Sequence, residues 1–118
     1  MPQRVELAYF TNDVSRMARF YEHLLGAQPV ARSADMAIFM AGATKLFIHK
    51  TYTPGPTDLP PENHVALSVP DLAAACQALA AQGLQLEIAP KSYDWGKSAY
   101  LRDPDGHLLE LNEASAGG

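Results

Sequence analysis

The sequence predicts an α+β fold in which two β-α-β-β-β modules follow one another, with curled mixed sheets around a shared cleft and the helices outside. Three observations predict it. The segment "VELAYFTNDVSRMARFYEHLLGAQ" aligns with "NHVALSVPDLAAACQALAAQGLQ", so that Glu6 falls on His64 and Asp13 on Asp71, both 58 positions apart (64 − 6 and 71 − 13). Each copy starts as a strand and continues as a helix that a glycine ends. Three further strand-like segments follow each helix.

The opening strand and helix of each module carry recognisable start and stop signals. "VELAYF" and "HVALSV" are rich in the β-branched and aromatic residues that strands favour. One of Asn12, Asp13 and Ser15 is suited to cap the first helix, and Asp71 to cap the second. Gly26 and Gly83 are suited to the left-handed residue that follows a helix.

Each predicted helix has an apolar stripe that should pack on its sheet. The spacing predicts a stripe of Met17, Phe20, Tyr21 and Leu24 on the first helix, and of Leu72, Cys76 and Leu79 on the second. Cys76 lies among alanines, which favours a small core residue over a nucleophile.

The remaining strands are expected at 27–33, 36–41 and 45–51 in the first module, and at 84–90, 98–103 and 107–113 in the second. Turns are expected at 41–43 and 104–106, where Gly and Pro-Asp-Gly occur. The Pro-rich segment 53–61 would link modules of about 3–52 and 62–114 within a single domain, 1–118.

Composition narrows the classes of partner and compartment. The net charge is −4 without a basic run, which argues against a nucleic acid or an anionic membrane surface as partner. No apolar run approaches the roughly 20 residues that span a bilayer, and the N-terminus lacks a signal-peptide core. A single cysteine excludes a disulfide within the chain and fits a reducing compartment. We therefore expect a cytoplasmic protein.

Side-chain alternation predicts a polar site in the cleft. If Leu109 and Leu111 face a helix, Glu110 faces the cleft, because successive strand residues point to opposite sides. The same argument, applied to the other strands, gives four inward candidates: Glu6, His49, His64 and Glu110. Imidazole and carboxylate side chains together suit a divalent ion such as Zn, Ni, Mn, Co or Fe(II).

A structural explanation stands beside the metal hypothesis. A carboxylate at a strand end is most often solvated or paired, and a histidine on an apolar strand is often only hydrogen-bonded. Glu110 has apolar neighbours, so burying it requires a partner. Phe47 also faces inward by this alternation, and a shift of register would make it, in place of His49, the inward residue nearest the metal.

Aromatic residues are candidates for the walls of a small-molecule pocket. Phe39, Phe47, Trp95 and Tyr100 are predicted to bind substrate. Trp95 lies in "KSYDWGKSAY", which we expect to be a flexible loop that serves either as an aromatic lid or as a packing corner.

The repeat, together with "DVSRMARFYEHLLG", "HVALSVPDLAAACQALAAQG" and "WGKSAYLRDPDGHLLEL", resembles the vicinal oxygen chelate superfamily. That superfamily includes glyoxalase I, extradiol dioxygenases, fosfomycin-resistance thiol transferases and bleomycin-resistance proteins. The resemblance implies a divalent-metal site on the first strand of each module and on the last strands, and a homodimer. His64 and Glu110 match two metal positions. Glu6 stands where the enzymes have His or Gln, and Phe47 or His49 stands where glyoxalase I has Glu.

Two functions follow from the resemblance and stay open at this point. One is a metal-dependent lyase, isomerase, transferase or dioxygenase acting on a small oxygenated molecule, with Glu110 or Glu6 as base. The other is a metal-free protein that binds a drug or metabolite between aromatic side chains, as the bleomycin-resistance members do. The sequence leaves open whether the cleft forms within one subunit or between two.

Overall fold

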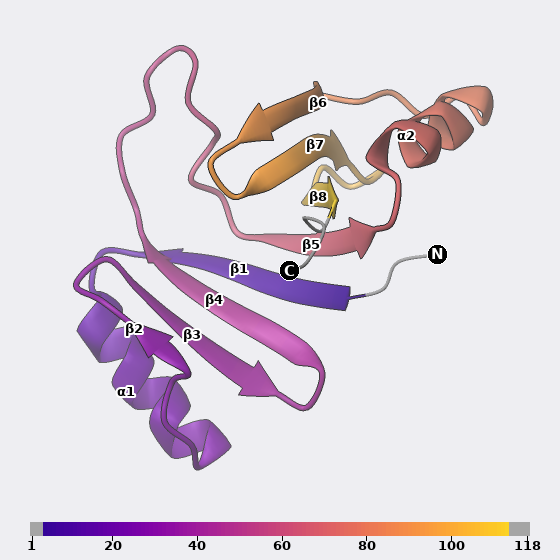
Figure 1. Ribbon diagram of the computed structural model, residues 1–118. Coiled ribbons are helices and arrows are strands. Elements are labelled where there is room, and N and C mark those ends of the chain that lie inside the picture. The colour runs from indigo at the N-terminus through magenta and orange to yellow at the C-terminus, as the bar shows by residue number, and fades with distance from the viewer. Residues whose placement is uncertain (1–3, 114–118) are drawn as a thin grey trace. The chain divides into compact units, whose positions relative to one another are not determined.

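The computed structural model describes residues 4–113 and contains, within them, the ten predicted elements in the predicted order (Figure 1). The first module consists of β1 (Arg4–Thr11), α1 (Val14–Leu25), β2 (Ala31–Arg32), β3 (Met36–Ala41) and β4 (Thr44–Lys50). The second consists of β5 (His64–Val69), α2 (Leu72–Ala81), β6 (Ile88–Tyr93), β7 (Gly96–Arg102) and β8 (Leu108–Glu113). The α+β class and the repeated β-α-β-β-β order are confirmed.

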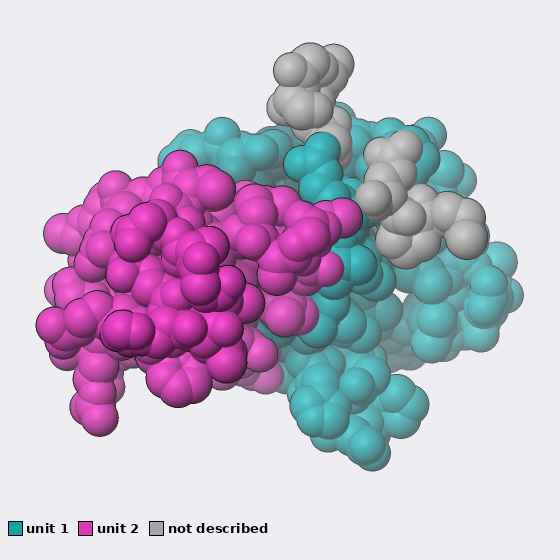
Figure 2. All heavy atoms as spheres, turned by 90° about the horizontal axis from the view of Figure 1, so that it is seen from below, with its two compact units in different colours: residues 1–5, 64–118 teal, residues 6–63 magenta. Residues whose placement is uncertain are grey.

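The described residues divide into two compact units, 6–63 and 64–113 with 4–5, which Figure 2 shows in magenta and teal. The strand order is β2-β3-β4-β1 in one module and β6-β7-β8-β5 in the other. In both modules the first strand pairs in parallel with the last, and the other pairs are antiparallel. The repeat is therefore one of topology as well as sequence. The curled cleft and the single domain concern both modules together and stay predictions.

Helix α1 covers one face of the first module's sheet, but its buried stripe differs from the predicted one. Met17 and Tyr21 pack against the core, as expected, whereas Phe20 is 58% exposed and Leu24 is 64% exposed. The buried stripe instead includes Val14 and Ala18. Ala18 is fully buried, and its small side chain suits a close approach of the helix to the sheet. That orientation turns Phe20 and Leu24 outward.

The helix boundaries follow the predicted capping chemistry. The side chain of Asp13 accepts a hydrogen bond from the Arg16 backbone N–H, and that of Asp71 accepts one from Ala74. Gly26 follows α1 with a φ of 65°, a conformation that residues with a Cβ rarely adopt. The predictions for Asp13, Asp71 and Gly26 are confirmed.

Helix α2 packs on the sheet of the second module. Leu72 and Cys76 are buried against β7 and β8 residues, and Leu79 packs at the edge of this core, as predicted. Burial raises the pKa of the Cys76 thiol, so the thiol stays protonated at neutral pH. This agrees with a small core residue.

The strand after α2 lies later in the chain than predicted. We expected a strand at 84–90 and a flexible loop around Trp95, but β6 runs from Ile88 to Tyr93 and forms a hairpin with β7. Asp94 and Trp95 make its turn, and Tyr93 pairs with Gly96. In a hairpin, the residues next to the turn pair first. The position of the turn therefore fixes where β6 lies, and the apolar run at Leu84–Ile88 does not.

The segment between the modules carries no helix or strand, as its prolines predict. Among residues 4–113, no helix is long and apolar enough to cross a membrane.

Candidate functional site

The face of the second module's sheet that points away from α2 carries two of the four predicted polar residues, His64 and Glu110. Leu109 lies at the edge of the α2 core and Leu111 lies within it, so Glu110 between them points to the other face. The strand register then places Ala66 and Tyr100 on either side of Glu110, one from β5 and one from β7. His64 precedes Ala66 by two positions and therefore shares this face.

His64 and Glu110 form a buried pair. His64 Nε2 lies 3.1 Å from Glu110 Oε1, and the two side chains are only 9% and 8% exposed. Their chain separation is large, so the parallel pairing of β5 with β8 brings them together. The contact shows that both side chains lie on one face of this sheet, as alternation predicts, and that this face lines a cleft stays a prediction.

The second oxygen of Glu110 is also held. The Ser98 hydroxyl donates to Glu110 Oε2 at 2.8 Å, and the Asn112 amide donates to the same oxygen at 3.3 Å. Ser98 in turn accepts a hydrogen bond from Trp95 Nε1 at 3.2 Å. Sequence reasoning missed Ser98 and Asn112, although the alternation that identified Glu110 also points to them, because they share its face on β7 and β8.

These contacts decide the charge of Glu110. Burial favours the neutral acid, but the hydrogen bonds from His64, Ser98 and Asn112 and the charge of His64 outweigh it, so the pKa of Glu110 lies below its ordinary value. The neighbouring Tyr100 is 3% exposed, and burial together with the Glu110 carboxylate raises its pKa. The site therefore holds an anionic carboxylate beside a neutral phenol at neutral pH.

This pKa shift predicts a pH dependence of stability. Because the folded state lowers the pKa of Glu110 below its unfolded value, the ionised group stabilises the fold above about pH 4.5, and the contribution is lost as the pH falls through the lower folded pKa. We expect the difference in free energy of unfolding between wild type and Glu110→Gln to be largest at neutral pH and smaller at pH 3. Urea unfolding at a series of pH values measures it, and a difference that grew on acidification would contradict the assignment.

One more polar side chain on this face is notable. Ser68 lies on β5 opposite Asn112 and is 8% exposed. Within residues 4–113, its hydroxyl is a buried side-chain atom without a hydrogen-bond partner. A buried hydroxyl with spare hydrogen-bonding capacity is a candidate contact for a ligand oxygen.

The candidates of the first module have other partners. Lys45 Nζ lies 3.1 Å from Glu6 Oε1, which is the paired carboxylate that the structural explanation anticipated. His49 Nδ1 lies 2.7 Å from the Lys50 carbonyl oxygen, and its ring stacks on Phe47 with centroids 5.7 Å apart. These contacts show that both side chains are positioned by their own module.

The strand register decides between Phe47 and His49 as the counterpart of Glu110. Phe47 lies opposite Ala8, as Glu110 lies opposite Ala66, and Ala8 and Ala66 are equivalent in the repeat. Phe47 therefore occupies the position of Glu110 in the first module, where no carboxylate is present. His49 corresponds to Asn112.

The predicted aromatic wall is divided between two environments. Phe39 is 1% exposed and lies in the core under α1, so it faces the helix and does not line the site. Tyr100 lies beside the site, with its ring 6.1 Å from that of His64. Trp95 is 57% exposed and stacks in parallel on Tyr93, with centroids 4.6 Å apart. Trp95 and Tyr100 remain candidates for ligand contacts.

No cluster of three or more His, Cys, Asp and Glu side chains that is suited to a metal ion occurs within residues 4–113. His64 and Glu110 are the two candidate donors within the second module. That Glu6 and His49 contribute to the same site concerns both modules and stays a prediction.

Comparison with models of known protein families shows which family the chain belongs to. The model of the Glyoxalase/Bleomycin resistance protein/Dioxygenase superfamily matches residues 4–111. The chain belongs to this superfamily. The resemblance inferred from the repeat is confirmed.

This superfamily member has distant relatives of known name. It is 27% identical to the probable lactoylglutathione lyase of Vibrio parahaemolyticus, over 89% of the chain and 88% of the relative. It is 36% identical to the lactoylglutathione lyase of Pseudomonas aeruginosa, but over only 47% of the chain and 31% of that protein. A superfamily member from Vibrio splendidus shares the fold, with a TM-score of 0.71 and 17% identity over 93% of the chain and 97% of its own.

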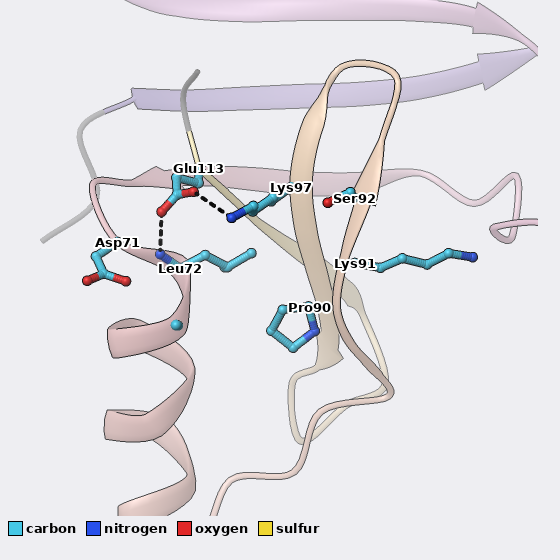
Figure 3. Close-up of a pocket in the computed structure, with 8 residues that line it drawn as sticks. Asp71, Leu72, Pro90, Lys91, Ser92, Lys97 and Glu113 are labelled. Atoms are coloured by element: carbon cyan, nitrogen blue, oxygen red, sulfur yellow. Dashed lines mark hydrogen bonds and ion pairs between the residues drawn. The ribbon is translucent and has the colours of Figure 1, made fainter. Parts of the chain in front are cut away.

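The second module also has a pocket of about 290 Å³ on the other side of its sheet, the side that α2 covers (Figure 3). Its lining includes Leu72, Lys97 and Glu113. Glu113 reaches the start of α2, where one carboxylate oxygen accepts a hydrogen bond from the Leu72 backbone N–H at 3.1 Å. Lys97 Nζ lies 4.0 Å from its other oxygen. The positive end of the helix is therefore already neutralised by the protein's own carboxylate.

This contact makes Glu113 a stabilising residue. We expect Glu113→Ala to lower the free energy of unfolding by about 1 kcal/mol, because the Leu72 N–H loses its acceptor and the helix N-terminus loses one of its two carboxylates, the other being Asp71. Lys97→Ala is the matched comparison, and since Lys97 is 61% exposed we expect its effect to be under about 0.5 kcal/mol. Urea unfolding checks both, and equal effects would show that the contact with the helix is unimportant.

Proposed function

We propose that the protein binds one divalent metal ion through His64 and Glu110 and acts as an enzyme on a small oxygenated molecule. The observation that carries the proposal is the buried contact between His64 Nε2 and Glu110 Oε1. An imidazole and a carboxylate are donors that Zn, Ni, Mn, Co and Fe(II) accept.

The distance between the two donor atoms fits shared coordination. Metal–nitrogen and metal–oxygen bonds of about 2.0–2.2 Å, at angles between tetrahedral and octahedral values, place neighbouring donors roughly 2.9–3.4 Å apart. The observed separation of 3.1 Å lies within this range. An ion would replace the proton that the two groups share without a large movement of either side chain.

The surrounding residues support a role of Glu110 as ligand more than as base. Its lowered pKa keeps the carboxylate charged, as coordination requires, but a general base works best with a pKa near the working pH. A bound ion would polarise a substrate oxygen as a Lewis acid. Tyr100, which stays protonated, and the Ser68 hydroxyl, which has no partner within residues 4–113, are candidates for orienting that substrate. The predicted base role of Glu6 stays a prediction.

Metal titration tests the proposal. We expect purified wild-type protein, freed of metal by chelator, to bind about one Zn²⁺, Ni²⁺, Mn²⁺, Co²⁺ or Fe²⁺ per chain in calorimetry, with elemental analysis as a second measure. Failure to bind any of the five ions would overturn it. Lactoylglutathione, named in the relatives, is the first substrate to assay with the loaded protein, followed by catechols and epoxides.

A metal-free binding protein for drugs or metabolites is the second candidate. It is favoured by the exposed ring of Trp95, which stacks on Tyr93 within one hairpin. Lys91 Nζ lies 5.5 Å from the Tyr93 ring and adds positive charge beside it. Quenching of Trp95 fluorescence by planar aromatic ligands in the presence of chelator would support this function, and the chain has a single Trp to report it.

The expected homodimer belongs to either function and stays a prediction. Light scattering of the purified protein during size exclusion measures it directly: a mass near 26 kDa, twice the 12.8 kDa of one chain, is the expected result.

A further inference from the structure

We infer that Ser98 is a positioning residue that holds Glu110 Oε2, so that Oε1, beside His64, is the oxygen directed to a metal ion, and that Ser98 connects the ion to the indole of Trp95. The inference rests on the proposed metal site. It assigns Ser98 a role beyond filling space in the sheet.

The environment of Ser98 is specific. It is fully buried on the central part of β7, where it faces the same side of the sheet as Tyr100. Its hydroxyl donates to Glu110 Oε2 and accepts from Trp95 Nε1–H, so both its hydrogen-bonding functions are used. A hydroxyl held from both sides has one orientation.

With the hydroxyl in this orientation, the two carboxylate oxygens of Glu110 have different partners. Ser98 and Asn112 both donate to Oε2, while Oε1 faces His64. Glu110 would therefore coordinate an ion through Oε1 alone, and a remaining position would stay open for water or substrate. Hydrogen bonds to the far side of a ligand set its orientation and typically change metal affinity by about 10–100-fold.

The hydrogen bond from Trp95 links the buried Ser98–Glu110 pair to an exposed side chain. Trp95 is largely exposed at the hairpin turn, yet its indole N–H is bound to the buried Ser98 hydroxyl. A change in the charge on Glu110 alters the polarity of the Ser98 hydroxyl, and through it the hydrogen bond from the indole. Metal binding at Glu110 should therefore be visible at Trp95.

Three variants test the role of Ser98, with Co²⁺ as the probe. Ser98→Ala removes the hydroxyl, Ser98→Gly removes it with the rest of the side chain, and Ser98→Thr keeps the hydroxyl. We expect Ser98→Ala and Ser98→Gly to bind Co²⁺ about 10–100-fold more weakly than wild type, and Ser98→Thr to retain most of the affinity. The visible spectrum of the bound Co²⁺ should change in Ser98→Ala, because a freed carboxylate can bind through both oxygens.

The indole signal supplies a second, independent measurement. In ¹H–¹⁵N spectra the single Trp gives one indole cross-peak, which we expect to shift when Zn²⁺ is added to wild type and to remain in place in Ser98→Ala. Unchanged affinity and spectrum in Ser98→Ala, or an indole shift that persists in it, would overturn the role of Ser98 while the metal site stands. Absence of Co²⁺ binding to wild type would overturn the proposed function and this inference together.

Discussion

Replacing His64 by Ala is expected to weaken divalent-ion binding by at least about 100-fold. Removing one of two buried protein donors takes away roughly 3 kcal/mol of binding free energy, the share of one ligand in a typical structural site. Calorimetric titration with Zn²⁺ and Co²⁺ measures the change.

His107→Ala is the matched control for this variant. His107 is also paired with a carboxylate, Asp103, but its side chain is 75% exposed and lies in the turn after β7. We expect His107→Ala to bind metal as wild type does. If His64→Ala, shown by circular dichroism to be folded, bound metal normally, the metal site would not be at His64.

Replacing Glu110 by Ala is expected to lower the free energy of unfolding by about 3–5 kcal/mol, even without metal. The change leaves His64, Ser98 and Asn112 without their shared acceptor in a buried setting, which costs more than the loss of an exposed ion pair. Urea unfolding in the presence of chelator measures this effect apart from metal binding.

Two comparisons sharpen the Glu110 experiment. Glu110→Gln keeps the shape and one acceptor oxygen, so we expect a smaller loss of about 1–2 kcal/mol together with a large loss of metal affinity. Glu87→Ala removes a carboxylate that is 43% exposed and paired with Arg102, and we expect under about 1 kcal/mol. A loss in Glu110→Ala no larger than that in Glu87→Ala would show that the buried pair contributes little.

The two helices show which structural features can be predicted from neighbouring residues and which cannot. Capping by Asp13 and Asp71 and termination at Gly26 involve neighbouring residues, and the structure agrees with these predictions. The exposed Phe20 was predicted to be buried because a stripe with i, i+3 and i+4 spacing can be drawn through either of two adjacent rows of α1. Only contact with the sheet, through the small Ala18, selects the row.

The hairpin around Trp95 shows the converse case. Its turn residues, Asp94 and Trp95, are not among the common hairpin pairs, so the sequence suggested a loop. Pairing between β6 and β7 is a contact between segments, which periodicity within one segment does not contain. The contact from Trp95 to Ser98 depends on that hairpin, and for this reason sequence reasoning missed it.

For the candidate site, the sequence alone determined the repeat, the superfamily, and the face on which His64 and Glu110 lie, because these depend on spacing along the chain and on strand alternation. The tertiary structure alone decided which polar groups hold Glu110, that Phe47 and not His49 is its counterpart, and that Phe39 belongs to the core. The reason is physical. Alternation gives the side of a sheet, whereas strand register and side-chain hydrogen bonds are set between segments that are distant in the chain.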